Sequence, residues 1–184
     1  DVKVGRVDIA GFNNKTFEFA ESIVSTMSND HVSFWLHVNG KKGRFFQDRN
    51  MRKAFQALVK KMFKENADYI TSLPRRFRPD FQTFLPLQAG RLRDSEIDRI
   101  IAEGEPFVDE LIERSKKTPI KTAISGSLSY AVPLLQKTGL VFENADIKSS
   151  LEVFDEMYKK NSFDVLAMGA SVHTSDPDGI YHLL

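Results

Sequence analysis

The residues of this sequence whose types could do chemistry gather near its end, at positions 169–178. This stretch reads Gly-Ala-Ser-Val-His-Thr-Ser-Asp-Pro-Asp, so small residues stand beside hydroxyl, imidazole and carboxylate groups. The apolar run at 163–168 precedes it and predicts a buried strand. In α/β proteins, loops at strand ends usually bind the ligand, although a plain surface turn has the same composition. We predict a ligand-binding loop with these contact residues: Gly169, Ala170, Ser171, Val172, His173, Thr174 and Asp176.

The same loop could instead serve a small hydrolase or a metal-dependent enzyme, using Ser171, His173 and Asp176 or Asp178. The Gly-x-Ser-x-Gly pattern of a hydrolase is absent there, and it is also absent at 125–127, where Ser-Gly-Ser follows another predicted strand. No histidine and carboxylate pair can be assigned to either serine from the sequence. We therefore predict a protein that is not an enzyme and has no catalytic residue.

Metal and cofactor sites are also not predicted. His173, Asp176 and Asp178 lack the spacing of a calcium loop, which needs more oxygen ligands and a distal Glu. Turns before Pro177, formed by Ser175 and Asp176, explain the same residues without a metal. The glycine-rich phosphate and dinucleotide motifs are absent, and the lack of Cys excludes thiolate chemistry, disulfides and Cys-ligated zinc.

Composition and charge narrow the possible partners. The 184 residues carry a formal net charge of +1, which argues against extensive nucleic-acid binding. One cluster, Arg-Arg-Phe-Arg at 75–78, could contact nucleic acid, but a solvated loop has the same pattern. No apolar run reaches the length of a membrane span, and no signal peptide is visible. A start at Asp1 indicates a processed or excised piece.

Strands and helices alternate along the sequence, which predicts an α/β fold with a mixed sheet flanked by helices. Residues 31–38 alternate between apolar and polar side chains, as a half-buried strand does. An amphipathic helix follows, capped by Asp48 or Asn50 and ending near Glu65. Other strands are predicted at 2–9, 120–124, 140–142 and 163–168, and the strand at 120–124 should be half-buried through Ile120, Thr122 and Ile124. Other helices are predicted at 16–27, from Ser95 on, at 106–117, 130–138 and 151–160.

Several segments resemble, in order, one family: the extracytoplasmic solute-binding proteins of ABC importers, in the oligopeptide, dipeptide and nickel class. Each motif alone is weak, but the ordered set spans nearly the whole chain. The matching segments are Val-Gly-Arg-Val-Asp-Ile at 4–9, the strand ending in Asn39, Phe-Gln-Asp-Arg-Asn-Met-Arg-Lys-Ala-Phe at 46–55, Leu-Leu-Gln-Lys-Thr-Gly-Leu at 134–140, and Phe-Asp-Val at 163–165 with Asp-Pro-Asp at 176–178.

The resemblance implies that residues 1–184 form one ligand-binding lobe of a two-lobed, periplasmic-binding-protein-like architecture, whose partner lobe is absent. A small solute or peptide would be enclosed between the lobes, which close by a hinge and then dock on the membrane permease. The protein would be periplasmic or extracellular and membrane-associated through the transporter. An interaction domain that reuses such a lobe, for instance in a regulator, is a further alternative. Arg52 would be structural and tie its helix to the preceding loop.

His173 is the position where this sequence departs from the family pattern. Peptide-binding members place an Asp three residues before Asp-Pro-Asp, where it pairs with the α-ammonium of the peptide. An imidazole cannot neutralise a buried ammonium. We therefore expect either a peptide that is bound differently or a solute that is not a peptide.

Overall fold

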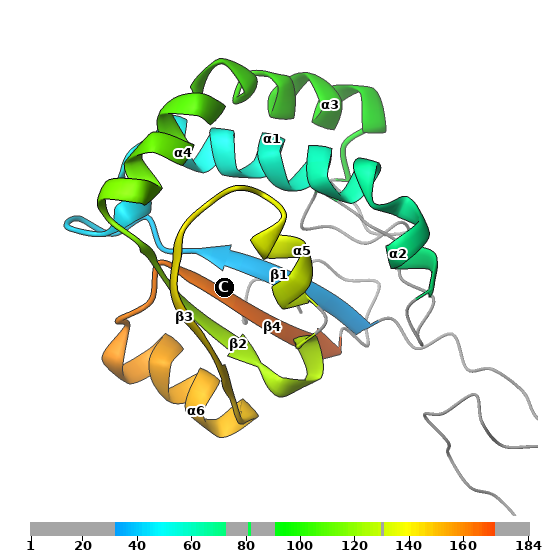
Figure 1. Cartoon of the computed structure of the whole chain (residues 1–184). Helices are drawn as coiled ribbons and strands as arrows, with labels where there is room; N and C mark the ends of the chain where they lie inside the picture. Colours follow the sequence, from blue (N-terminus) through cyan, green and yellow to red (C-terminus); the bar gives the residue numbers. More distant parts are fainter. Residues whose placement is uncertain (1–31, 73–80, 82–90, 130, 172–184) are drawn as a thin grey trace, which may run out of the picture.

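A four-stranded mixed sheet forms the centre of the computed structural model, which describes residues 32–72, 81, 91–129 and 131–171. The strands are β1 (Val32–Val38), β2 (Ile120–Ser125), β3 (Phe142–Lys148) and β4 (Val165–Ser171). Their order is β1-β4-β2-β3 (Figure 1). β2 is parallel to both β3 and β4, whereas β1 is antiparallel to β4. The predicted mixed α/β class is therefore confirmed.

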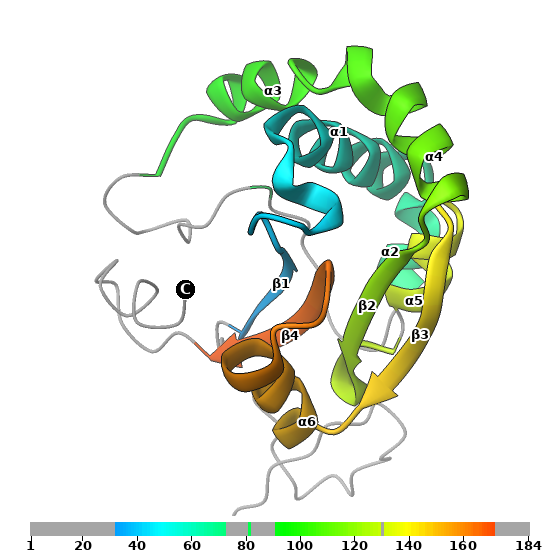
Figure 2. The ribbon, with the colours of Figure 1, turned by 90° about the vertical axis from the view of Figure 1, so that its left-hand side faces the viewer.

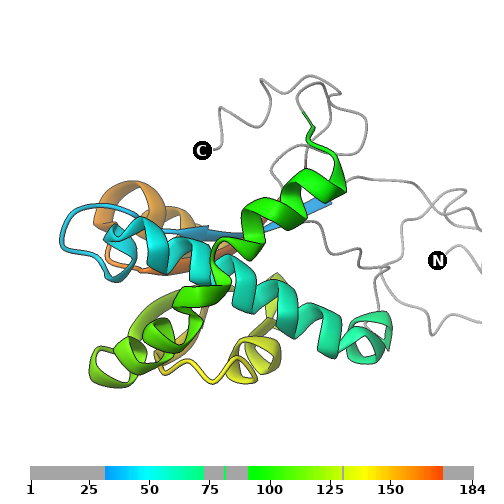
Figure 3. The same ribbon diagram turned by 90° about the horizontal axis from the view of Figure 1, so that it is seen from above.

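Helices cover both faces of this sheet, but unequally. In Figure 2, α6 lies on one side of the strands, and α1, α4 and α5 lie on the other. Figure 3 shows α3 crossing α1. The helices are α1 (Arg49–Glu65), α2 (Ala67–Ser72), α3 (Asp94–Ala102), α4 (Val108–Lys117), α5 (Ala131–Gln136) and α6 (Ser150–Asp155), which continues as a π turn (Glu156–Lys160).

The helix α1 provides most of the larger core. Asp48 caps it as predicted, because its side chain accepts a hydrogen bond from the Asn50 N–H at 2.7 Å. The amphipathic pattern predicted for this helix is confirmed. Its apolar face is buried, except that Phe63 is half-buried where it packs against the core. Each fully buried apolar side chain contributes roughly 1.5–3 kcal/mol. The buried residues of this helix are Met51, Ala54, Phe55, Ala57, Leu58, Val59 and Met62.

Arg52 has the structural role that was expected. Its Nη1 donates hydrogen bonds to the carbonyl oxygens of Phe46 and Gln47, at 2.7 and 2.9 Å. These carbonyls belong to a short 3-10 helix (Phe45–Gln47) just before α1. The side chain therefore ties α1 to the turn that precedes it.

A smaller core lies on the other face of the sheet, beneath α6. It contains Ala123, Val153, Phe163, Leu166 and Met168. The prediction that β2 is half-buried is therefore wrong. Ala123 and Ser125 are buried as well as Ile120, Thr122 and Ile124, because β2 is an inner strand with helices on both faces.

The bounds of two elements differ most from the predictions. β3 runs to Lys148 and does not end at 142, because the polar residues of this edge strand conceal it in the sequence. α3 begins at Asp94, so Ser95 lies inside the helix and does not cap it. The Glu96 carboxylate accepts the Arg93 N–H at 3.0 Å and supports that helix start. The segments predicted at 2–9 and 16–27 lie outside the described residues.

A buried polar network joins the amino ends of the parallel strands to the end of β1. The Asn39 N–H donates to the carbonyl oxygen of Asp164 at 2.9 Å. The Asn39 side-chain amide donates to Asn161 Oδ1 at 2.8 Å and to the Phe163 carbonyl at 2.9 Å. These hydrogen bonds hold the start of β4 in place. They therefore also set the direction in which β4 runs toward the carboxyl ends of the parallel strands.

Candidate functional site

The carboxyl ends of β2, β3 and β4 meet at one edge of the sheet, because the three strands are parallel. Ser125, the last residue of β2, pairs in register with Lys148, the last residue of β3. The ladder between β2 and β4 ends with Ile124 opposite Ala167, so Met168 is level with Ser125. Residues 169–171 of β4 therefore extend beyond the end of β2. This projecting end of the sheet is the candidate ligand-binding edge.

The predicted loop begins later than expected. Gly169, Ala170 and Ser171 belong to β4, so the expectation that they lie in a loop is wrong. They pair with Phe34, Ser33 and Val32 of β1. Small residues have a low intrinsic preference for strands, so it is this backbone pairing with β1 that extends β4 through them. The other predicted contact residues, Val172, His173, Thr174 and Asp176, lie outside the described residues.

The fold brings together two Ser/Gly segments that the sequence analysis treated separately. After Ser125 the chain turns at once into a 3-10 helix, Gly126–Leu128, which packs against β4. Leu128 anchors this turn in the core at 2% exposure, and Ser125 is buried beside it at 5%. The Ser-Gly turn after β2 and the Gly-Ala-Ser end of β4 therefore form adjoining parts of one edge.

The corner after β3 is built by a helix cap. The Ser149 Oγ accepts the Glu152 N–H at 3.3 Å, and the Glu152 carboxylate accepts the Ser149 N–H at 2.8 Å. The hydrogen bond from the Ser149 side chain, and then that from its backbone, lowers the pKa of Glu152. The Ser-x-x-Glu pattern is the signal that would have located this corner from the sequence.

Lys148 places a positive charge at this corner, and this charge is paired with the carboxylate of Glu156. Its Nζ lies 3.9 Å from Glu156 Oε1, and the lysine side chain is 24% exposed. Glu156 belongs to the π turn that continues α6, and its carboxylate also accepts a hydrogen bond from the Ser162 hydroxyl. Because Glu156 lies in the middle of the helical segment 150–160, the Lys148 ammonium extends along α6 and not beyond the end of β3.

The connections that leave β2 and β3 diverge. α5 follows β2 and buries Leu134 and Leu135 in the larger core, whereas α6 follows β3 and buries Val153 in the smaller core (Figure 2). In open α/β sheets, neighbouring strands whose connections pass to opposite faces leave a crevice outside their carboxyl ends, where ligands bind. The β2–β3 pair is such a point, and it adjoins the projecting end of β4.

The chemistry that the described part of this edge offers is hydrogen bonding. Within the described ranges, no group of three or more His, Asp or Glu side chains is placed to hold a metal ion. No helix in the same ranges is long and apolar enough to cross a membrane. The alternatives that use His173, Asp176 or Asp178 for catalysis or metal binding depend on residues outside those ranges.

Comparisons of this chain with protein families, with curated proteins and with solved structures gave no match.

Proposed function

We propose that this chain is the ligand-binding lobe of a solute-binding protein that serves an ABC importer. In this proposal a peptide or other small solute binds at the carboxyl edge of β4, and a second lobe of the same protein closes over it. The closed protein then delivers the solute to a permease from the periplasmic or extracellular side. The lobe binds and releases its ligand and catalyses no reaction.

One observation carries the proposal: β4 projects beyond β2 at the edge where three parallel strands end. The projecting residues pair with β1 and are therefore held in place on that side, and the segment predicted to be a polar loop, 172–178, follows them in the sequence. A strand end that is held by pairing and leads into a polar loop beside a topological switch point is the arrangement in which α/β proteins bind small ligands.

The motif residues with described structure support the proposal in a second way. Asn39, Arg52 and Asp164 lie in segments that resemble the family, and all three hold the scaffold together. None of them lies at the carboxyl edge, so their roles agree with a family whose members share a scaffold and differ in their ligands. The identity of the solute then depends on the loop, where His173 replaces the expected acid.

A thermal-shift screen of the full-length protein against peptides, sugars and metal chelates tests the proposal. A ligand present at about 100 times its Kd stabilises the folded state by about 2.7 kcal/mol, so a true ligand raises the melting temperature measurably. We expect at least one solute class to do so in a saturable manner.

Matched variants connect such a shift to the proposed edge. Ser171→Phe adds bulk at the carboxyl end of β4, whereas Thr118→Phe adds similar bulk at an exposed position before the amino end of β2. We expect the first variant to abolish the shift and the second to retain it. Equal loss in both variants contradicts the proposal. Turnover of the solute that His173→Ala abolishes would instead favour the hydrolase alternative.

A further inference from the structure

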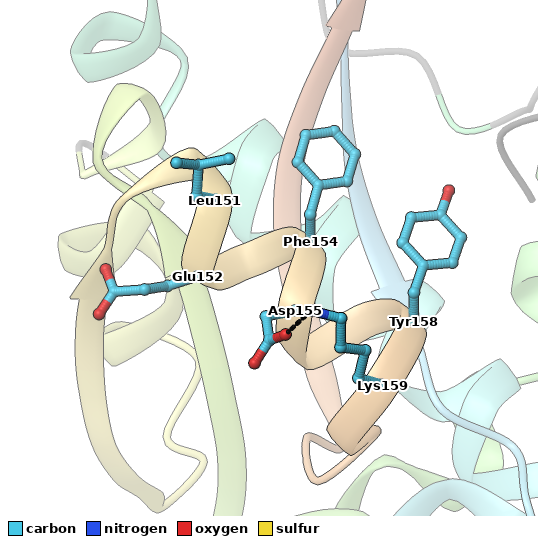
Figure 4. Close-up of a pocket in the computed structure, with 6 residues that line it drawn as sticks. All are labelled: Leu151, Glu152, Phe154, Asp155, Tyr158 and Lys159. Atoms are coloured by element: carbon cyan, nitrogen blue, oxygen red, sulfur yellow. Dashed lines mark ion pairs between the residues drawn. The ribbon is translucent and has the colours of Figure 1, made fainter.

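The outer face of α6 and of the π turn after it exposes three large apolar side chains. Leu151, Phe154 and Tyr158 are 82%, 43% and 61% exposed. Their spacing of three and four residues places them on one stripe of the helix, as Figure 4 shows. The Phe154 and Tyr158 rings stack, with centroids 6.1 Å apart and planes 7° from parallel. A contiguous exposed apolar stripe of this kind marks an interaction surface.

The hollow along this stripe is open on the side away from the helix. Its volume is about 480 Å³, and all of its lining residues come from this one helical segment: Leu151, Glu152, Phe154, Asp155, Tyr158 and Lys159. Within the described part of the chain, no second element faces them across the hollow. A surface with one wall suits another helix better than a small molecule, which needs enclosure on several sides.

The charges beside the stripe change sign along the helix. Glu152 and Asp155 are acidic residues of its first half, and Lys159 and Lys160 are basic residues of its second half. Within the chain, Asp155 pairs with Lys159 at 2.8 Å and with Lys160 at 3.2 Å. A partner helix that runs in the opposite direction with the same charge order would place acids beside bases along its whole length.

We propose that this stripe binds a second copy of the chain, with the two α6 segments antiparallel about a twofold axis. Leu151 then packs against the partner's Tyr158, and Phe154 lies beside the axis. Glu152 lies on the same flank as the partner's Lys159. A twofold contact requires a surface that is complementary to itself, and this charge order meets that requirement.

Other occupants fit the surface less well. A partner with a uniformly acidic or basic face would match only half of the charge pattern. A parallel arrangement of two copies would place the flank that carries Glu152 and Lys159 against the opposite flank of the partner, so this pairing of acid with base would be lost. The proposal depends on α6 alone, so it stands or falls separately from the proposed ligand site.

Sedimentation of the purified chain over a range of concentrations tests the proposal. Because three side chains make a small interface, we expect weak dimers with a Kd on the order of 10⁻⁴ M. Phe154→Glu should weaken association at least about tenfold, since it buries a charge beside the axis. Val141→Glu is the matched control. Val141 is 39% exposed and lies just before β3, outside the α6 stripe, so this substitution should not affect association.

Charge exchange distinguishes a second copy from every other partner. In chains with E152K alone or K159E alone, like charges meet across the twofold axis, so each variant by itself should associate more weakly than the unmodified chain. A mixture of the two variants should associate again, because each contact then joins opposite charges. Restoration in the mixture would have no explanation if the stripe bound something else.

Cross-linking provides a second readout that does not depend on a measurable Kd. The chain has no Cys, so F154C introduces a single thiol. Beside a twofold axis that thiol should form a disulfide with its own copy much faster than the thiol of V141C does. Equal rates, together with a monomer at every concentration, overturn the proposal. Binding of lipid vesicles that Phe154→Glu abolishes, without self-association, overturns it in favour of a membrane surface.

Discussion

The buried carboxylate of Asp164 accepts a hydrogen bond from the backbone N–H of Phe45 at 3.0 Å, although 119 residues separate the two along the chain. The other carboxylate oxygen accepts the Lys121 N–H, also at 3.0 Å. One side chain therefore joins the start of β4, the start of β2 and the turn before α1. This junction lies at the edge of the sheet opposite the candidate ligand site, so it supports the site without contacting it.

Asp164→Asn should destabilise the fold by about 1–3 kcal/mol, because the amide keeps one acceptor and turns a donor toward a buried N–H. Urea unfolding followed by circular dichroism measures the change. Asp98→Asn is the control, since Asp98 is 63% exposed and its ion pair with Lys60 should contribute under about 1 kcal/mol. If the two variants unfold at the same urea concentration, the Asp164 junction has no special role.

Gly104 is expected to tolerate no side chain, for a steric reason. A Cβ at this position would lie 2.1 Å from the backbone carbonyl oxygen of Lys53 in α1. Gly104→Ala should therefore force the segment between α3 and α4 away from α1 and cost roughly 1–3 kcal/mol or more. Gly40→Ala is the matched control, because its Cβ would meet only the tip of the Arg52 side chain, at 3.1 Å. Thermal unfolding should show a much larger loss for Gly104→Ala than for Gly40→Ala.

The partly buried imidazole of His37 should make the free energy of unfolding depend on pH. Burial lowers the pKa of its imidazole below the ordinary value, and its ring lies against Phe163 with centroids 5.9 Å apart. As pH falls, the unfolded chain binds this proton before the folded chain does. The contribution of the neutral imidazole is therefore fully present above about pH 6.5 and is lost as pH falls through the folded pKa.

Unfolding free energies measured at intervals from neutral to acidic pH test this expectation. The unmodified chain should lose stability over this interval, and His37→Gln should show a smaller loss because the buried titrating group is gone. A proton NMR titration that places the pKa of His37 at or above its ordinary value would refute the assignment.

Segments in which apolar residues recur at regular spacing were predicted correctly. The alternation at 31–38 identified β1, and the structure places Leu36 and Val38 against the larger core while His37 faces Phe163 on the other side. The apolar face of α1 was predicted for the same reason, because local spacing determines which side chains share one face. Its cap was predicted as Asp48 or Asn50, and the structure has Asp48. β3 is an edge strand rich in polar residues and has no regular alternation, which explains why the strand predicted at 140–142 overlaps it only at Phe142.

Features that depend on contacts between distant segments were not predictable. Gly169, Ala170 and Ser171 have low strand propensity, and only their pairing with β1 extends β4 through them. The register that leaves these residues projecting beyond β2 also depends on how three separate segments pair. The exposed stripe of α6 was overlooked for a related reason, since an apolar residue on a helix gives no sign of whether another element covers it.

His173 determines which solutes the proposed site should accept. If residues 169–178 contact the ligand as proposed, His173→Asp should add the carboxylate that a peptide α-ammonium requires. We expect affinity for peptides with a free amino terminus to rise by about tenfold or more, because a buried ion pair replaces an unpaired ammonium. Calorimetric titration of free and N-acetylated forms of one peptide measures the gain, which only the free form should show. A gain for both forms would contradict this role of His173.

Hydrogen–deuterium exchange of the full-length protein, with and without the solute found by thermal shift, tests the central claim most directly. Backbone amides of bound segments exchange more slowly, so exchange reports where the ligand binds. We expect protection at 169–178 and at the turn after β2, with no change along the outer face of α6 or in the loop at 39–44. Protection confined to those two control segments, with the end of β4 unchanged, would contradict the account.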